Sequence, residues 1–174
     1  MHRRMVFKSH STPNAQEEVL EYCLHAVRAE LFNGPRTLLV FGTYTIGKER
    51  LFLHVAQALQ KQVYVNKAKM DILRCCQLDD ALTALLTTDP AATNLHALPL
   101  FMVNFSKLAA MARQLPQYDV IVGFQPTGWS FAPKPGRGGG DEGQRARPAT
   151  RSQRGKIILY QVTAHRSGFL VDDK

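Results

Sequence analysis

The sequence lacks a long apolar run. Its longest apolar stretches, such as residues 97–103, are far shorter than the roughly 20 residues that a membrane-spanning helix needs. The N-terminal segment MHRRMVFKSHSTP is basic and contains no continuous hydrophobic region, so a secretory signal is not expected. We therefore expect no membrane partner.

Cysteine is also scarce. The chain has three cysteines, Cys23, Cys75 and Cys76, and no C-x-x-C pair. Adjacent residues such as Cys75 and Cys76 form a disulfide poorly, so reduced thiols in a cytosolic or nuclear compartment are the expectation. Without a C-x-x-C pair, a zinc site built from thiolates has no support.

Acidic residues are outnumbered. The chain has 22 Lys and Arg against 14 Asp and Glu, which gives a formal net charge of +8. This balance favours an anionic partner, with nucleic acid the first candidate. However, residues 134–156 contain seven Lys or Arg and two acids, so this segment alone accounts for five of the eight excess charges. A solvated loop would carry the same charge, so charge alone does not establish nucleic-acid binding.

Short apolar runs alternate with amphipathic segments along the 174 residues, which are enough for one domain with a substantial core. The predicted strands are 37–41, 62–65, 98–103, 118–124 and 156–162, and the predicted helices are 13–33, 48–60, 67–76 and 105–115. Such alternation is typical of βαβ units. The sequence thus predicts an α/β fold with a mostly parallel sheet and helices on both faces.

Residues 132–155, APKPGRGGGDEGQRARPATRSQRG, break this pattern. They are rich in Gly, Pro and Arg and show no apolar periodicity, which predicts a disordered insertion. An arginine-rich element that binds nucleic acid is the alternative. The strand predicted at 156–162 must then pair back across the insertion with the same sheet, or with a segment outside this chain.

The segment GTYTIGKE, residues 42–49, nearly matches the phosphate-binding pattern G-x-x-x-x-G-K-[ST]. The last position holds Glu49, whereas a nucleotide hydrolase uses a hydroxyl there to bind Mg²⁺. A carboxylate would add negative charge beside the phosphates, so the sequence argues against nucleotide hydrolysis. The alternative is that Gly42 and Gly47 only allow a tight turn between a strand and a helix.

The longer stretch LLVFGTYTIGKERLFLHVAQAL resembles the DNA cross-link repair nucleases. These are metallo-β-lactamase proteins with an inserted β-CASP domain, and Artemis is a relative. The stretches MDILRCCQLDD, LLTTDPAATNLHALPL, VNF and YDVIVGFQPTGWS follow in the family's order. The resemblance implies a β-CASP-like domain over 13–131, a disordered basic insertion over 132–155, and a returning strand with the start of the C-terminal metallo-β-lactamase part over 156–174. Residues 1–12 are then a disordered or wrongly assigned N-terminus.

The family consists of zinc-dependent 5′-to-3′ DNA exonucleases of the nucleus, which act in interstrand cross-link and double-strand-break repair. Their metal ligands come mostly from an H-x-H-x-D-H motif and from an Asp in a D-T-T-Y-like stretch. Neither motif occurs here, and none of the six histidines forms an H-x-H pair. The resemblance therefore implies a chain that starts just after that aspartate, binds no zinc alone and is inactive by itself.

Two functions follow from the resemblance. In the first, the chain is a fragment of a DNA repair nuclease and supplies the β-CASP region that forms the DNA groove. Its partners would be damaged or single-stranded DNA ends and the missing metallo-β-lactamase half, which would pack on this domain. In the alternative, the chain is a catalytically inactive DNA- or protein-binding module from a truncated paralogue.

Few residues are candidates for a site, and no catalytic residue is assigned. Lys48, with Thr45 at the expected helix N-cap, is a candidate for binding a DNA phosphate, and the alternative is a surface lysine with a structural cap. His165 is the one candidate metal ligand, because the family has a metal-binding histidine after the corresponding strand. The alternative for His165 is an ordinary exposed histidine. Trp129 is expected either to stack on a base or to fill the domain interface, and His96 is expected to be a packing residue.

Overall fold

A computed structural model of the chain describes residues 15–76, 78, 80–126 and 149–162. Its elements, in chain order, are α1 (Ala15–Asn33), β1 (Thr37–Thr43), α2 (Glu49–Leu59), β2 (Val63–Tyr64), α3 (Lys67–Cys75), α4 (Asp80–Ala84), β3 (Leu86–Thr87), β4 (Leu95–Pro99), the 3-10 helix η1 (Leu100–Met102), α5 (Phe105–Gln114), β5 (Val120–Pro126), β6 (Ala149–Arg154) and β7 (Ile157–Val162). The sequence patterns missed α4 and β3, because segments this short show no period.

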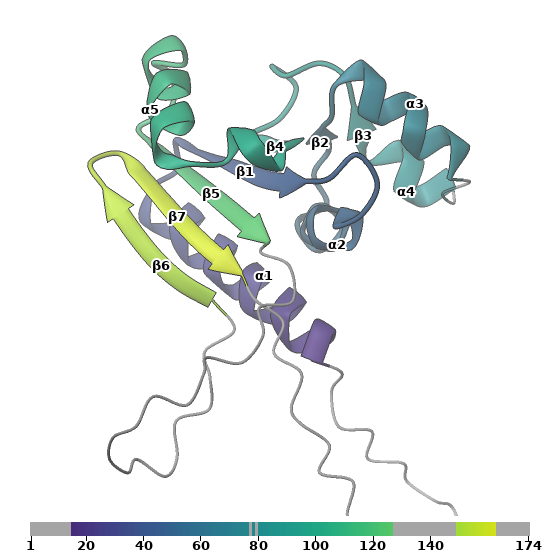
Figure 1. Cartoon of the computed structure of the whole chain (residues 1–174), viewed down its shortest axis with the longest axis horizontal. Helices are drawn as coiled ribbons and strands as arrows, with labels where there is room; N and C mark the ends of the chain where they lie inside the picture. The colour runs from purple at the N-terminus through teal and green to yellow at the C-terminus, as the bar shows by residue number, and fades with distance from the viewer. Residues whose placement is uncertain (1–14, 77, 79, 127–148, 163–174) are drawn as a thin grey trace, which may run out of the picture.

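The described strands form one seven-stranded sheet in the order β3-β2-β4-β1-β5-β7-β6 (Figure 1). Neighbouring strands run parallel, except for β6 and β7, which are antiparallel. β1 lies between β4 and β5, and all of its residues are buried. A parallel strand covered on both faces reads as a continuous apolar run, which explains the stretch TLLVF. The predicted α/β fold with a mostly parallel sheet is confirmed.

Helices cover both faces of the sheet, with α1 and α2 on one face and α5 on the other (Figure 1). Alternate residues of β1 pack into two different buried clusters. Leu39 and Phe41 belong to the cluster that includes residues of α1 and α2. Leu38 and Val40 belong to the cluster that includes Leu108 of α5. Successive strand residues point to opposite faces, so β1 contributes to both halves of the core.

β4 begins and ends earlier than the sequence predicts. The strand predicted over 98–103 is wrong, because the strand ends at Pro99 and the following residues form η1. β4 pairs with β1 from Leu39↔Leu95 to Thr43↔Pro99, so the two strands end together. A Cβ atom on Gly42 would lie 2.6 Å from Cδ1 of Leu100, which shows that η1 packs directly on the end of β1. Residues 100–102, in the second half of the apolar run, therefore pack over the end of β1 and do not extend β4.

The prediction of disorder over 132–155 is wrong for residues 149–154. Residues 149–154 form β6, which makes an antiparallel hairpin with β7 through Gly155 at φ 55°. Glycine adopts this left-handed conformation without steric cost. The composition gave no strand signal, because Ala149 is the one buried residue of β6 and its two arginines, Arg151 and Arg154, are exposed. The guanidinium of Arg154 lies 4.6 Å from the ring centroid of Phe105 on α5. Residues 132–148 lie outside the described part of the chain.

The strand predicted at 156–162 returns to the same sheet, because β7 pairs in parallel with β5. Three aromatic rings stack across neighbouring strands on the α1 face. The ring centroids of Phe41 and Phe124 lie 4.9 Å apart, and those of Phe124 and Tyr160 lie 5.0 Å apart. This stack ties β7 to the centre of the sheet.

A buried carboxylate joins α1 to both strands of the hairpin. Oε1 of Glu30 accepts a hydrogen bond from the Tyr160 hydroxyl at 2.7 Å and one from Nε of Arg151 at 2.9 Å. Burial raises the pKa of Tyr160, and its hydrogen bond to Glu30 raises it further, so the hydroxyl stays protonated. The hydrogen bond to Glu30 raises the pKa of Arg151, against the opposing effect of burial. Arg151 of β6 and Tyr160 of β7 thus both donate to the Glu30 carboxylate.

The cysteines carry free thiols, as the sequence predicts. Cys23 is buried in the core, and burial raises the pKa of its thiol to about 12. Cys75 and Cys76 are exposed at the end of α3. Within the described part of the chain, every helix is too short or too polar to cross a membrane.

Candidate nucleic-acid interface

At the edge of the sheet where the parallel strands end, the connections from the neighbouring strands β1 and β4 leave in opposite directions. β1 and β4 are neighbours and end together at Thr43 and Pro99. From β1 the chain runs through α2 to β2 on one side, and from β4 it runs through α5 to β5 on the other side. α2 and α5 also cover opposite faces (Figure 1). In open α/β sheets, ligands bind outside the carboxyl ends of the strands at such a switch point.

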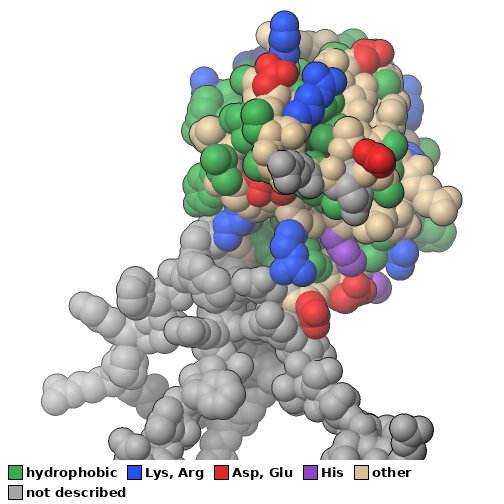
Figure 2. Space-filling model, turned by 90° about the vertical axis from the view of Figure 1, so that its right-hand side faces the viewer, with side chains coloured by type: hydrophobic (Ala, Val, Ile, Leu, Met, Phe, Trp, Pro, Cys, Tyr) green, Lys and Arg blue, Asp and Glu red, His purple; other side chains and the backbone are tan. Residues whose placement is uncertain are grey.

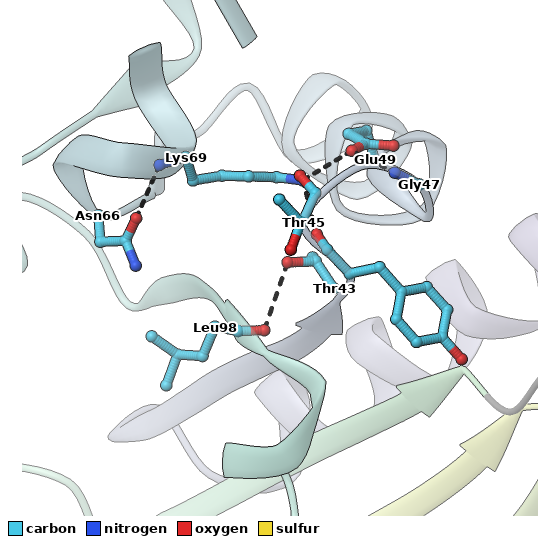
Figure 3. Close-up of polar contacts among 8 residues, drawn as sticks. Thr43, Thr45, Gly47, Glu49, Asn66, Lys69 and Leu98 are labelled. Carbon is cyan, nitrogen blue, oxygen red and sulfur yellow. Dashed lines mark hydrogen bonds and ion pairs between the residues drawn. The ribbon is translucent and has the colours of Figure 1, made fainter. Parts of the chain in front are cut away.

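Residues 44–48 join β1 to α2 at this switch point, and a buried lysine holds them in place (Figure 3). Lys69 of α3 has only 8% of its side chain exposed. Its ammonium donates to the carbonyl oxygens of Tyr44 and Thr45, both at 3.0 Å, and to Oε1 of Glu49 at 2.6 Å. A lysine ammonium has three N–H donors, so these three acceptors satisfy it completely. We refer to residues 44–48 as the switch loop.

Glu49, the first residue of α2, closes the switch loop from the other side. Its Oε1 accepts the backbone N–H of Gly47 at 2.7 Å in addition to the Lys69 ammonium. Burial alone would raise the pKa of the Glu49 carboxyl, but hydrogen bonds from Lys69 and from the backbone, with the Lys69 charge, outweigh it. The pKa therefore lies below its ordinary value, and the carboxylate stays ionised at neutral pH.

The local sequence of α3 places Lys69 for this contact. Asn66 is the N-cap of α3, and its side-chain oxygen accepts the backbone N–H of Lys69 at 2.8 Å (Figure 3). Asparagine is among the preferred N-cap residues because its short side chain reaches the free N–H groups of the first turn. The cap therefore anchors the backbone of the residue whose side chain holds the switch loop.

This geometry differs from that of a phosphate-binding loop. In such a loop, backbone N–H groups face the anion. In the switch loop, two backbone carbonyls face a cation, and the N–H of Gly47 is already bound by Glu49. Gly42, the first glycine of the sequence pattern, lies within β1. Glu49, the residue that departs from the phosphate-loop pattern, thus binds a loop N–H group itself.

The predicted N-cap role of Thr45 is wrong. Lys48 is the N-cap of α2, with φ 72° and ψ 11°, and its side chain makes no capping hydrogen bond. The prediction failed because the Glu49 side chain turns back and binds the N–H of Gly47 itself. Thr45 is exposed and Lys48 is half-buried. The structure thus brings both candidate DNA-binding residues onto one loop at the switch point.

Large apolar side chains are exposed on the switch loop and on η1, and sequence reasoning missed them. Tyr44 is 44% exposed, Ile46 is 71% exposed and Phe101 of η1 is 72% exposed. η1, which carries Phe101, is held by Asn104, whose amide nitrogen donates to the Phe101 carbonyl at 2.9 Å and whose oxygen caps α5. Tyr44 and Ile46 share the switch loop, and apolar side chains exposed on one short segment are more informative than a single one. In the sequence, these residues lie next to apolar runs and are easily assigned to the core.

Charge on this side of the molecule is mixed. Figure 2 shows the side toward which β1 and β5 point in Figure 1. Lys and Arg side chains lie among Asp and Glu side chains and apolar surface, and neither sign dominates the described residues seen in this view. The described residues in this view therefore form no surface of a single charge sign.

His96 is a packing residue, as the sequence predicts. It is buried, and its Nε2 lies 3.1 Å from the carbonyl oxygens of both Pro90 and Thr93. A nitrogen that faces two carbonyl oxygens must carry the proton. Burial lowers the pKa of His96, and the two carbonyls oppose this shift. Its Nε2 is thus fully used by the backbone.

The described residues contain no group of three or more His, Cys, Asp or Glu side chains able to hold a metal ion. Catalytic zinc sites typically use three protein ligands. The described part of the chain by itself therefore does not fit a catalytic zinc ion. His165, the candidate metal ligand, and Trp129, the candidate stacking residue, lie outside the described residues.

A protein-family model matches part of the chain. The family model described as DNA repair metallo-beta-lactamase matches residues 80–164. The match runs from the start of α4 to just beyond β7, so it includes the end of β4 and η1 on one side of the switch point. The switch loop precedes it.

Several DNA cross-link repair proteins are similar to the chain. It is 34% identical over 119 residues to the DNA cross-link repair 1A protein of Mus musculus, covering 68% of this chain and 12% of that protein. It is 34% identical over 149 residues to the DNA cross-link repair protein SNM1 of Arabidopsis thaliana, covering 85% of this chain and 29% of that protein. A Schizosaccharomyces pombe protein, DNA cross-link repair protein pso2/snm1, is 32% identical over 120 residues, which are 68% of this chain and 21% of that protein. The chain thus spans less than a third of the length of these relatives.

Proposed function

Because this chain belongs to the family of DNA cross-link repair proteins that carry the DNA repair metallo-beta-lactamase domain, we propose that it supplies the β-CASP region of a DNA repair nuclease. In this proposal the whole nuclease removes nucleotides from 5′ ends during the repair of interstrand cross-links and double-strand breaks in the nucleus. Its zinc ions are held by the metallo-β-lactamase half. The present chain contributes one wall of the groove that receives the DNA.

The placement of the switch loop is the observation that carries this proposal. Exposed Thr45 and half-buried Lys48 lie on a loop held by hydrogen bonds at the carboxyl edge of the sheet. A lysine in this position can bind a DNA phosphate, and the exposed ring of Tyr44 offers a face on which a base can stack. A few local contacts of this kind suit a strand end better than a long duplex.

The chain alone is proposed to bind DNA without cutting it. Its sequence contains no H-x-H-x-D-H motif, and hydrolysis by metal-activated water needs such a set of ligands. The ligands would come from the metallo-β-lactamase half, which packs against this region. An inactive binding module is the rival, and it differs in gaining no activity when that half is supplied.

The test is binding of a single-stranded oligonucleotide with a 5′ phosphate and a 3′ fluorophore, measured by anisotropy. Lys48→Ala is expected to weaken binding equally for different base sequences and to reduce the salt slope of the affinity by about 0.7, the value for one phosphate contact on single-stranded DNA. The matched control is Lys61→Ala, an exposed lysine that contacts Asn94 at the opposite edge of the sheet and should bind normally. Wild-type affinity in Lys48→Ala would refute the proposed site.

Activity is tested with the same oligonucleotide in the presence of zinc. The chain alone is expected to leave it uncut, because no complete ligand motif is present in the sequence. Adding a separately produced metallo-β-lactamase half of a family member is expected to produce shortening from the 5′ end. Turnover by the chain alone, or no turnover after the addition, would contradict the assignment.

A further inference from the structure

We propose that Lys69 of α3 is a positioning residue for DNA binding, which holds the switch loop in the shape that presents Thr45 and Lys48. This inference rests on the DNA-binding function proposed above. It concerns a residue in another element, 20 or more positions away in sequence from the loop residues it binds.

Lys69 is not suited to contact DNA itself. Its side chain is almost entirely buried, and its ammonium already makes three hydrogen bonds, to Tyr44, Thr45 and Glu49. These use every N–H donor of a lysine. A phosphate could bind Lys69 only by displacing one of them. Its effect on DNA must therefore pass through the loop.

The switch loop needs such a restraint. Gly47 and Lys48 both have positive φ angles, 112° and 72°. For a residue with a side chain, the left-handed region is sparsely populated and persists only where the surroundings enforce it. Within the described residues, the loop's own polar contacts are those to Lys69 and the bond from Gly47 to Glu49 (Figure 3). Lys69 contacts both the loop backbone and the acid that closes it, so it controls both restraints.

The geometry also explains why a donor is required at this position. Two of the three acceptors are backbone carbonyls, which no acidic side chain can bind. An ion pair of reversed polarity between positions 49 and 69 would keep the attraction between the two helices. It would lose both carbonyl contacts and the bond from Gly47 N–H to position 49. Charge reversal therefore shows whether the attraction between the two helices is enough by itself to hold the loop.

The first experiment compares Lys69→Met with Lys67→Met, an exposed lysine on the same helix, in the full chain. Amide exchange at Gly47 is measured by NMR without DNA, and affinity is measured with the 5′-phosphorylated oligonucleotide. Lys69→Met is expected to speed exchange at Gly47 and to weaken binding by about tenfold, the size expected for losing a charge-assisted hydrogen bond. Lys67→Met should change neither.

The second experiment tests the link between Lys69 and Lys48. If Lys69 acts by positioning Lys48, the double variant Lys69→Met, Lys48→Ala should bind as weakly as either single variant. Additive losses would show that the two lysines act independently and would overturn the inference. The reversed pair Glu49→Lys, Lys69→Glu should remain loose at Gly47 and weak in binding, and recovery of both would also overturn it.

The outcomes separate this inference from the proposed function. Normal binding by Lys48→Ala refutes the DNA site, and the inference that depends on it fails too, even if Lys69→Met speeds exchange at Gly47. Weak binding by Lys48→Ala together with unchanged exchange and binding in Lys69→Met refutes the inference alone. If Lys69→Met shows no cooperative thermal unfolding, Glu49→Gln replaces it, since it keeps the size and an acceptor oxygen. Glu49→Gln should give smaller changes in the same direction, and no change would overturn the inference.

Discussion

Lys48 combines an unfavourable backbone conformation with a position in the switch loop. Its φ of 72° lies in the left-handed region, which costs a residue with a Cβ atom about 1–2 kcal/mol. Gln60, just after the other end of α2, has φ 52° and lies in the same region, away from the switch loop. Residues held in such conformations are often found where function requires them. The two positions therefore form a matched pair for separating backbone strain from DNA binding.

Lys48→Gly is expected to raise the free energy of unfolding by about 0.5–1 kcal/mol and to weaken DNA binding, because glycine removes the strain and the charge together. Gln60→Gly should give a similar gain in stability with normal DNA binding. Urea denaturation measures the first quantity and oligonucleotide anisotropy the second. A loss of stability in Lys48→Gly would show that the lysine side chain stabilises the fold, against the view that it is kept for binding.

At the scale of elements, Glu30 connects α1 to the β6–β7 hairpin. Its carboxylate is buried, whereas the Arg151 side chain that pairs with it is 43% exposed. Tyr160 is the buried partner, and its ring also continues the aromatic stack from Phe124. An ion pair with one exposed member contributes modestly, because water screens it. The hydrogen bond from Tyr160 is therefore expected to stabilise the fold more than the ion pair with Arg151 does.

Tyr160→Phe is expected to lower the free energy of unfolding by about 1.5–3 kcal/mol, which is typical for a hydrogen bond to a charged group. The phenylalanine ring keeps the stacking contact, so the loss reports the hydroxyl. The measurement is urea denaturation of this variant alone and in a Glu30→Gln background. The loss should shrink in that background, and equal losses in both would show that the hydroxyl does not act through Glu30.

At the scale of the whole molecule, the net charge of +8 overstates the charge available for DNA. Of the seven Lys and Arg between 134 and 156, Arg151 is paired with Glu30 and Arg154 lies over the ring of Phe105. Deleting the whole segment would also remove β6, so a deletion would mix loss of charge with loss of structure. Substitution of individual cations avoids this problem.

The four cations that precede β6 in this segment are Lys134, Arg137, Arg145 and Arg147. Replacing all four with Gln is expected to make the dependence of log K on log[salt] shallower, by about 0.7 for each one that contacts a phosphate of single-stranded DNA. Anisotropy titrations at several salt concentrations give the slope. An unchanged slope would mean that these residues make no phosphate contact, and binding would then rest on the switch loop.

The sequence by itself determined the fold class, the main strands and the family. Continuous apolar runs such as 37–41 and 118–124 report strands buried on both faces, and helical periodicity reports the helices between them. These signals are local, so they can be read along the chain. The ordered set of stretches from 38–59 to 118–130 carried the family resemblance in the same way.

Only the tertiary structure decided how the candidate site is built. Lys69 looks like any helical lysine in the sequence, and its burial arises because α3 packs where the switch loop turns. Thr45 is a residue type that often caps helices. In the structure, however, the Glu49 side chain accepts the N–H of Gly47, and Lys48 is the N-cap of α2. β6 forms because the outer edge of β7 is free to pair and because Glu30 and Phe105 receive its arginines. Each of these outcomes depends on partners far away in sequence, and a pattern read along the chain contains no information about which distant groups meet.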